Sequence, residues 1–211
     1  MIKNQNRSGW IGASDTYKAM MPFDSKTFRA FWLEKLGVTS GHFRSKAMMA
    51  GSWYEHRILD QLGIKRRDRQ IRLRPLRLRV NLDGEDRDTI YEVKTYGGEA
   101  FKVSPAYWRQ AQAEMFAARK KLVIVAYRLL PEDYENYFNP IDLARISFHP
   151  VEYDPDWVRS QYCPRLLLLA DFLRKGAMPC EGKSAGFNLV FKASSIYLSA
   201  YLRMVERRMR P

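Results

Sequence analysis

The chain has 211 residues, of which 46% are apolar and 28% are charged, a composition typical of a soluble globular protein. This length predicts one domain with a substantial core, and the absence of any run of 18 apolar residues argues against a membrane span. Lysine and arginine outnumber aspartate and glutamate by 36 to 23, so the net charge of +13 favours a polyanionic partner.

The start of the chain is polar and carries no signal-peptide pattern, which predicts a cytoplasmic location. Two cysteines are present, Cys163 and Cys180. Two cysteines cannot form a zinc or iron–sulfur site by themselves, so we expect reduced thiols.

The first predicted helix runs through residues 17–20, with Ser14 as its N-cap. Residues 12–13 would then offer free backbone amides at the positive end of the helix dipole, which suits a phosphate. Arg7 could supply a charged fork to the same anion. A capped surface helix with an unrelated arginine is the simpler alternative.

Two amphipathic helices are predicted next, over residues 25–37 and from Ser45 onwards. The apolar face of the second helix collects Met48, Ile58, Leu59 and Leu62. Glu55 falls on that face, where a carboxylate is costly unless it meets a cation or hydrogen bonds. Glu55 is therefore either the partner of a buried arginine or a candidate site residue.

Residues 71–82 alternate as a strand, with a phase break at Pro75. The polar face of this strand carries Arg72, Arg74, Arg77 and Arg79. A solvated face is the usual meaning of such a run. Because the strand leads to a candidate metal site, the run points more to contact with successive phosphates.

A hairpin is predicted after that strand. Residues 84–88 have turn composition, and residues 89–95 are rich in β-branched and aromatic side chains, so the turn would set Asp83 beside Glu92. Because side chains alternate along a strand, Glu92 and Lys94 point the same way. Two carboxylates and an ammonium on one face predict a Mg²⁺ site with a lysine placed to help a water attack a phosphodiester. A merely solvated hairpin face is the alternative.

Further along, Ser104 and Pro105 open a helix that turns Gln112 inward with apolar neighbours. Strands are predicted over residues 122–130, buried on both faces, and over residues 146–153. A long helix over residues 157–174, a loop over 181–192 and a basic amphipathic helix over 195–210 complete the predicted elements.

Five motifs stand in one order along the chain: IGASD, MMAGSWYE, LDG, EVK and YWRQAQ. Together they resemble the lambda-exonuclease-type (YqaJ-like) viral recombination nucleases, a branch of the PD-(D/E)XK superfamily. The resemblance implies an α/β fold with a restriction-endonuclease-like core, a mixed central β-sheet flanked by helices, in a domain of residues 1–180. Residues 181–211 extend past the motifs, and we expect a basic C-terminal extension packed on or beside the same domain.

By this resemblance, the activity would be digestion of one strand of linear duplex DNA from its 5′ end. It would need Mg²⁺, or alternatively Mn²⁺, and neither an organic cofactor nor an iron–sulfur cluster. The implied catalytic residues are Glu55, Asp83, Glu92, Lys94 and Gln112, with Gln110 as the alternative to Gln112. The implied metal ligands are Asp83, Glu92, the carbonyl of Val93 and Glu55.

The resemblance also assigns roles around that centre. Lys94 would orient or activate the attacking water, and Arg7 and Ser14 match positions that hold the 5′-phosphate. Expected partners are duplex DNA with free ends, a single-strand annealing protein and two further copies of the chain in a trimer, in the host cytoplasm if a phage encodes the protein. The alternatives are a related endonuclease of restriction or repair, and a basic nucleic-acid-binding module without catalysis.

Overall fold

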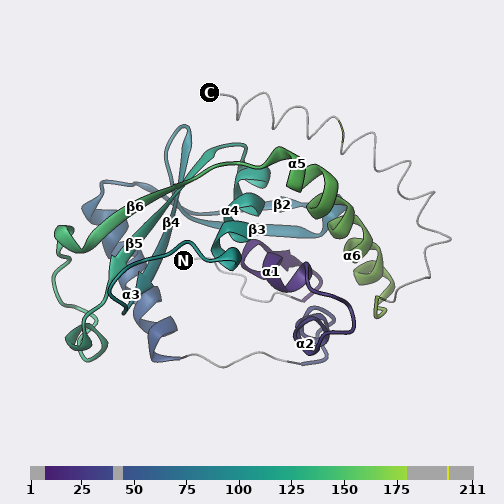
Figure 1. The fold of residues 1–211 in the computed structure, drawn as a ribbon, viewed down its shortest axis with the longest axis horizontal. Helices are drawn as coiled ribbons and strands as arrows, with labels where there is room; N and C mark the ends of the chain where they lie inside the picture. Colours follow the sequence, from purple (N-terminus) through teal and green to yellow (C-terminus); the bar gives the residue numbers. More distant parts are fainter. Residues whose placement is uncertain (1–7, 40–44, 180–198, 200–211) are drawn as a thin grey trace.

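A mixed β-sheet lies at the centre of the computed structural model, which describes residues 8–39, 45–179 and 199 (Figure 1). The strands in these residues are β1 (Ile11–Gly12), β2 (Arg66–Leu73), β3 (Leu78–Glu85), β4 (Thr89–Tyr96), β5 (Lys121–Arg128) and β6 (Ile146–Val151). They follow the order β1-β3-β4-β5-β6, and β2 pairs with β3 off this path. The β1–β3 and β4–β5 pairs are parallel and the others are antiparallel, which confirms the predicted mixed sheet.

Helices flank this sheet, as predicted. They are α1 (Thr16–Ala19), α2 (Lys26–Lys35), α3 (Lys46–Gln61), α4 (Pro105–Ala118), α5 (Pro155–Trp157) and α6 (Cys163–Lys175). Serines cap three of them: the hydroxyls of Ser25, Ser45 and Ser104 each accept a backbone N–H three residues later. A π-helical stretch, Val158–Tyr162, joins α5 to α6 and makes the long helix predicted over residues 157–174 irregular.

Two apolar clusters fill the two faces of the sheet. In one, Leu122 and Ile124 of β5 belong to a core shared with α2, α4 and α6. In the other, Val125 and Tyr127 of the same strand pack with side chains of α3. Strand β5 is therefore buried on both faces, which confirms that part of the prediction, and each fully buried aliphatic side chain contributes about 1.5–3 kcal/mol.

The strand predicted over residues 71–82 is wrong as a single element. Strand β2 ends at Leu73, a 3-10 helix follows over Arg74–Leu76, and β3 returns antiparallel from Leu78. Pro75 lacks an N–H and has a fixed φ, so it starts a reversal here instead of a bulge. Arg77 closes the reversal in the left-handed region, with φ of 50°.

The turn between β3 and β4 is shorter than predicted, because β3 continues through Gly84 to Glu85. Asp86 forms the turn by accepting the N–H groups of Asp88 and Thr89 at 2.9 and 2.7 Å. Gly84 serves packing instead: a Cβ there would lie 2.8 Å from Cδ2 of Leu59, on α3.

Within the described residues, no helix combines the length and the apolar character that crossing a membrane requires. Cys163 is a buried free thiol, and Cys180 lies outside the described residues. The predicted loop over 181–192 lies outside them as well, and so does the predicted helix over 195–210 except for Ser199. The structure therefore describes almost none of the proposed C-terminal extension.

Candidate active site

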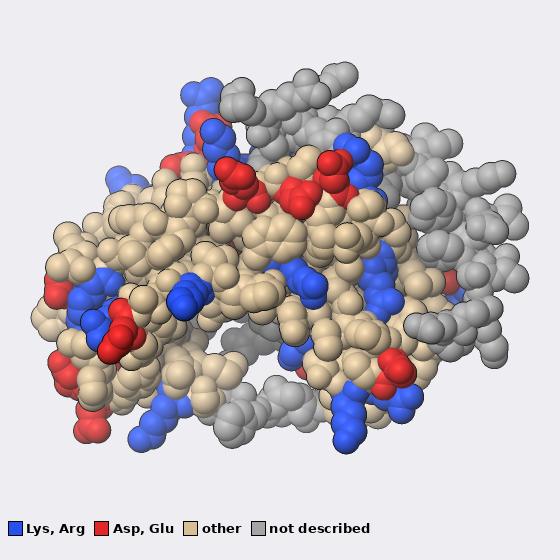
Figure 2. Space-filling model, viewed as in Figure 1, with Lys and Arg blue, Asp and Glu red and all other residues tan. Residues whose placement is uncertain are grey.

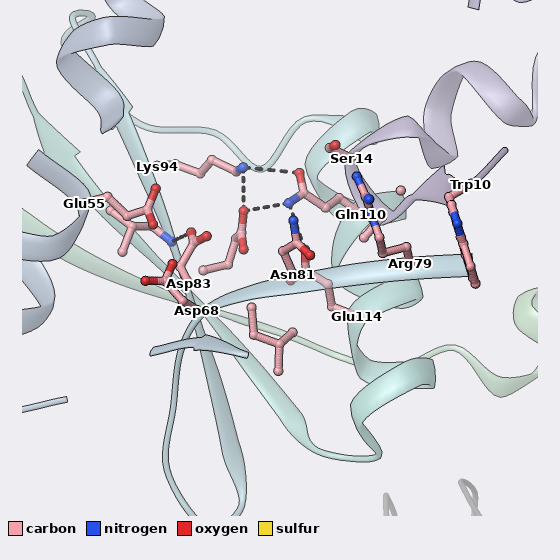
Figure 3. Close-up of a pocket in the computed structure, with 15 residues that line it drawn as sticks. Trp10, Ser14, Glu55, Asp68, Arg79, Asn81, Asp83, Lys94, Gln110 and Glu114 are labelled. Carbon is pink, nitrogen blue, oxygen red and sulfur yellow. Dashed lines mark hydrogen bonds and ion pairs between the residues drawn. The ribbon is translucent and has the colours of Figure 1, made fainter. Parts of the chain in front are cut away.

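A pocket of about 340 Å³ opens between α3 on one side and residues 10–14 on the other, and its floor is formed by β3, β4 and α4 (Figure 3). The face of the molecule in Figure 2 is hollowed between α3 and the α1–α2 side, with lysine and arginine side chains nearby. The carboxylates that line the pocket are Glu55, Asp68, Asp83, Glu92 and Glu114. The cationic side chains in its lining are those of Lys94 and Arg79, so the pocket lining is formally acidic.

Asp83 and Glu92 come together because β3 and β4 separate. The two strands pair only at Gly84–Tyr91 and Glu85–Ile90, next to the turn. Beyond that point the side chain of Asp83 bridges the gap, and its Oδ2 accepts the N–H of Val93 at 2.9 Å. The hairpin therefore brings both acids to one pocket, where the sequence placed them.

Glu92 and Lys94 lie on the same face of β4, as alternation predicted. Lys94 Nζ donates to Glu92 Oε1 at 2.7 Å and lies 5.0 Å from the centre of the Tyr107 ring. Burial acts to lower the pKa of Lys94, but the carboxylates of Glu92 and Asp83 outweigh it, so that pKa is raised above its ordinary value. In the metal-free protein Lys94 is accordingly an ammonium ion, which donates hydrogen bonds to its neighbours.

Glu55 projects from α3 towards Asp83, across the pocket from Gln110 (Figure 3). The apolar face predicted for α3 was partly wrong: Met48 is 57% exposed, whereas Ile58 and Leu59 are buried as predicted. Burial, and then the carboxylates of Glu92 and Asp68, raise the pKa of Glu55 to about 7. In the described part of the chain, Glu55 forms no ion pair with an arginine.

The pKa of Asp83 is raised for the same reasons as that of Glu55. Burial, and then the carboxylates of Glu92 and Glu55, hold its pKa well above the ordinary value. Two neighbouring acids that both resist ionisation indicate a site with more negative charge than its own cations neutralise. Glu92 Oε2 is also buried without a hydrogen-bond partner among the described residues. Such a site suits a hard divalent cation, which prefers oxygen ligands.

Gln110, and not Gln112, is the glutamine of this pocket. Gln110 Nε2 donates to Glu92 Oε1 at 2.6 Å, and its Oε1 accepts from Lys94 Nζ at 3.2 Å (Figure 3). Gln112 is fully buried elsewhere: it donates to the carbonyl of Glu152 and accepts the N–H of Asp154. The placement of Gln112 in the site was therefore wrong, because its inward direction leads to the β6–α5 connection.

Glu114 was not predicted. It is 0% exposed, and its Oε1 accepts from Gln110 Nε2 at 2.8 Å. Burial, and then the carboxylate of Glu92, hold its pKa well above the ordinary value. From residue 111 to 118, α4 is buried on every side, so its sequence has no single apolar stripe to single out this position. The spacing of four residues from Gln110 is the signal that places both side chains on one face.

Asp68 was also missed. It lies inside β2 with φ of 55°, a left-handed value that strand alternation does not anticipate. Glu55, His56 and Asp68 offer ligand atoms within 4.8 Å of one another, so this edge of the pocket is another place that could bind a metal ion. Asn81, on β3 beside Arg79, adds an uncharged polar group and accepts from Gln70 Nε2 at 3.0 Å.

The four arginines predicted on one strand face instead lie on two antiparallel strands and the reversal between them, because Pro75 turns the chain back. Arg79 is 5% exposed and lines the pocket, directly opposite Arg72 in the register of the sheet. The guanidinium groups of Arg72 and Arg77 lie 5.7 and 5.8 Å from the ring centre of Trp10, which also lines the pocket. Arg74 is exposed on the 3-10 helix.

Ser14 lines the pocket but caps no helix. It is an exposed residue inside a 3-10 helix, Ala13–Asp15, and the side chain of Asp15 accepts the N–H of Gly12 at 2.8 Å. A buried ion pair of 2.7 Å between Lys35 and Asp15 holds this arrangement. The backbone N–H of Gly12, which we expected to be free for a phosphate, is therefore already donated to Asp15. Arg7 lies outside the described residues.

Comparisons with known proteins support the fold. No family model matches the chain, and no curated protein sequence does. The crystal structure of an alkaline exonuclease from Laribacter hongkongensis is similar, with a TM-score of 0.55 and 17% identity. The match covers 80% of this chain and 93% of that one. At this identity, the similarity establishes a common fold, a mixed sheet flanked by helices.

Proposed function

We propose that this protein is a divalent-metal-dependent deoxyribonuclease that hydrolyses one strand of linear duplex DNA from the 5′ end. The observation that carries the proposal is the convergence of Glu55, Asp83 and Glu92 on one pocket together with the Lys94 ammonium. The similarity of the fold to that of an alkaline exonuclease supports it. The net charge of +13 supports a polyanionic substrate.

The residues present fit a metal ion, because carboxylate oxygens crowd together with too few cations among them. Asp83, Glu92 and the carbonyl of Val93 would hold one ion, and Glu55 would contribute to a second. Mg²⁺ is the proposed ion, with Mn²⁺ as the alternative, because all of these ligands are oxygens. Bound there, a divalent ion would lower the pKa of a water and neutralise charge on the phosphate.

The protein's own groups would then prepare the attack. Lys94, an ammonium ion in the metal-free protein, would orient the attacking water by donating to it and would stabilise negative charge that builds up on the phosphate. Gln110 would keep Lys94 in place, because its carbonyl accepts from the ammonium while its amide N–H groups face carboxylates.

The opposite end of the pocket would receive the DNA end. Arg79 lies inside it, and Arg72 and Arg77 lie on Trp10 at its rim. We assign Arg79, with Ser14 and Arg7, to the terminal 5′-phosphate, and Arg72, Arg74 and Arg77 to phosphates further along the duplex. A function in phage-type DNA recombination, with a single-strand annealing protein as partner and a trimeric assembly, belongs to the same hypothesis.

The test is digestion of end-labelled linear duplex DNA in Mg²⁺, Mn²⁺ or EDTA, beside a covalently closed plasmid of the same sequence. We expect mononucleotides from the 5′-ended strand with either metal, none with EDTA, and an intact plasmid. Cleavage of the closed circle would favour the endonuclease alternative. Binding without any cleavage, with either metal, would favour a nucleic-acid-binding module.

A further inference from the structure

The Glu92–Lys94 ion pair on β4 is hydrogen-bonded to a side chain of helix α4, that of Gln110. We propose that Glu114 is a positioning residue of the metal site: acting through the Gln110 side chain, it fixes where the Glu92 carboxylate and the Lys94 ammonium lie. This inference rests on the proposed nuclease function and adds a supporting residue to its site.

The side-chain amide of Gln110 can take only one orientation. Its Nε2 donates one hydrogen bond to Glu92 Oε1 at 2.6 Å and one to Glu114 Oε1 at 2.8 Å, while its Oε1 accepts from Lys94 Nζ at 3.2 Å. Rotating the amide by half a turn would place N–H groups against an ammonium and a carbonyl oxygen against two carboxylates. Lys94 and Glu92 set the direction of the amide, Glu114 accepts its second N–H and so restrains it, and the amide connects Glu92 to Lys94 (Figure 3).

Packing alone does not account for an acid at this position. Glu114 is 0% exposed between Ala113 and Met115, both also buried, and its Oε2 has no hydrogen-bond partner among the described residues. A buried carboxyl group costs free energy that an apolar side chain of similar size would not, so stability would favour leucine or methionine here. The hydrogen bond that Glu114 Oε1 accepts comes from Gln110, which is the route we assign to its effect.

The proposal predicts how the effect is distributed. Glu114 is 0% exposed in the wall of the pocket, so it cannot contact the bulk of a bound duplex. Without the carboxyl group of Glu114, the Gln110 amide would lose one of its two acceptors and be held less firmly, so Glu92 and Lys94 would lose a fixed partner. Metal affinity and turnover should therefore fall, while the KM for DNA should stay unchanged.

The experiment is a double-mutant cycle on the full chain. It uses Glu114→Leu, which keeps volume and removes the acceptor, Glu114→Gln, which keeps an acceptor, Gln110→Ala, and Glu114→Leu with Gln110→Ala. Gln112→Leu is the matched control, a buried glutamine of the same helix whose hydrogen bonds lead away from the pocket. Three quantities are measured: the Mg²⁺ concentration that half-saturates the thermal shift of the DNA-free protein, and kcat and KM on linear duplex DNA.

We expect Glu114→Leu to weaken Mg²⁺ binding and to lower kcat, each by about 10- to 100-fold, with KM unchanged. Glu114→Gln should retain most of both, because its side-chain oxygen still accepts from Gln110. The double variant should be no worse than Gln110→Ala alone, since the two residues act in series. Gln112→Leu should lower only the Tm.

Three results would overturn the proposal. Glu114→Gln as defective as Glu114→Leu in Mg²⁺ binding would make Glu114 a direct ligand. If the effects of Glu114→Leu and Gln110→Ala on Mg²⁺ binding and kcat add in the double variant, Glu114 acts independently of Gln110. If Glu114→Leu, like Gln112→Leu, lowers only the Tm, the role of Glu114 is structural. A wild-type protein without nuclease activity would refute the proposed function separately, and the Mg²⁺ midpoints, measured without DNA, would still decide the role of Glu114.

Discussion

The two ends of the pocket are built by different means. At the acidic end, Asp83, Glu92 and Lys94 lie on two paired strands, and hydrogen bonds of 2.6–3.2 Å connect them to the backbone and to α4. At the arginine end, the charges lie on a 3-10 turn and on strand positions near it, and two of them contact the ring of Trp10. The acidic end is fixed and crowded with like charge, as the proposed catalysis on a bound ion requires. At the other end, Arg72 and Arg74 are exposed, as the proposed contact with a phosphate backbone requires.

Removing a carboxylate at the acidic end should have the largest effect. Asp83→Asn and Glu92→Gln should each lower the cleavage rate by at least about 100-fold, because the ion that Asp83 and Glu92 would hold together loses a ligand in either variant. Both variants should bind DNA as well as the wild type or better, since one charge that repels phosphate is removed. Each should also raise the Tm of the metal-free protein, because repulsion among the acids is relieved. Cleavage at a near wild-type rate by either variant would place the active site elsewhere.

Neutralising the arginine end should weaken binding without stopping the chemistry. Replacing Arg72, Arg74 and Arg77 together by glutamine should reduce affinity for all duplex sequences alike. The slope of log affinity against log salt should flatten by about one unit for each phosphate that the variant no longer neutralises. Filter binding or fluorescence anisotropy over a salt series gives this slope. An unchanged slope would mean that these arginines face solvent or another subunit.

The two ends also differ in how well the sequence foretold them. Strand alternation was sufficient for Glu92 and Lys94, because the period of two holds wherever a strand is regular. It failed for Asp68, whose left-handed φ departs from that period, and for the arginines, which a reversal at Pro75 separates. Local patterns describe regular backbone and do not reveal where it departs from regularity.

Helix α4 illustrates a second limit. Its second half is buried on all sides, so hydrophobic periodicity could not tell which glutamine faces the pocket, and Gln112 was chosen over Gln110. The cap predicted at Ser14 failed for a related reason: the competing carboxylate of Asp15 is favoured by a distant residue, Lys35. The fold class followed from motif order, but the choice between neighbouring polar residues depended on tertiary contacts.

A smaller effect should mark the recognition of the DNA end. Duplexes with a 5′-phosphate should be degraded several-fold faster than the same duplexes with a 5′-hydroxyl, because a dianion gains more where cationic donors converge. Arg7→Ala should remove most of this preference and leave the metal chemistry intact. Single-turnover rates on the two oligonucleotides measure it. Equal rates in the wild type would point to the endonuclease alternative or to the opposite polarity.

The smallest expected change is in thermal stability with pH, at the acidic end. The pKa of Glu55 is raised to about 7, so between its ordinary pKa and 7 the folded protein binds a proton that the unfolded chain releases. The metal-free protein should therefore be more stable at pH 6 than at pH 8 as far as this group is concerned. The rise in Tm on adding Mg²⁺ should be larger at pH 8, and Glu55→Gln should reduce that difference. A Tm shift that is the same at both pH values in the wild type would contradict this account.

The glycine at position 84 has a consequence for the geometry of metal binding. Its neighbour in the chain is Asp83, and the side chain that fills the space above it belongs to Leu59, one turn of α3 beyond Glu55. Leu59 is 0% exposed, so a methyl group at residue 84 would force its side chain, and that of Ile64 beside it, to shift within a packed core. The close approach of β3 to α3, the two elements that carry the proposed ligands Asp83 and Glu55, thus depends on the absence of a side chain at residue 84.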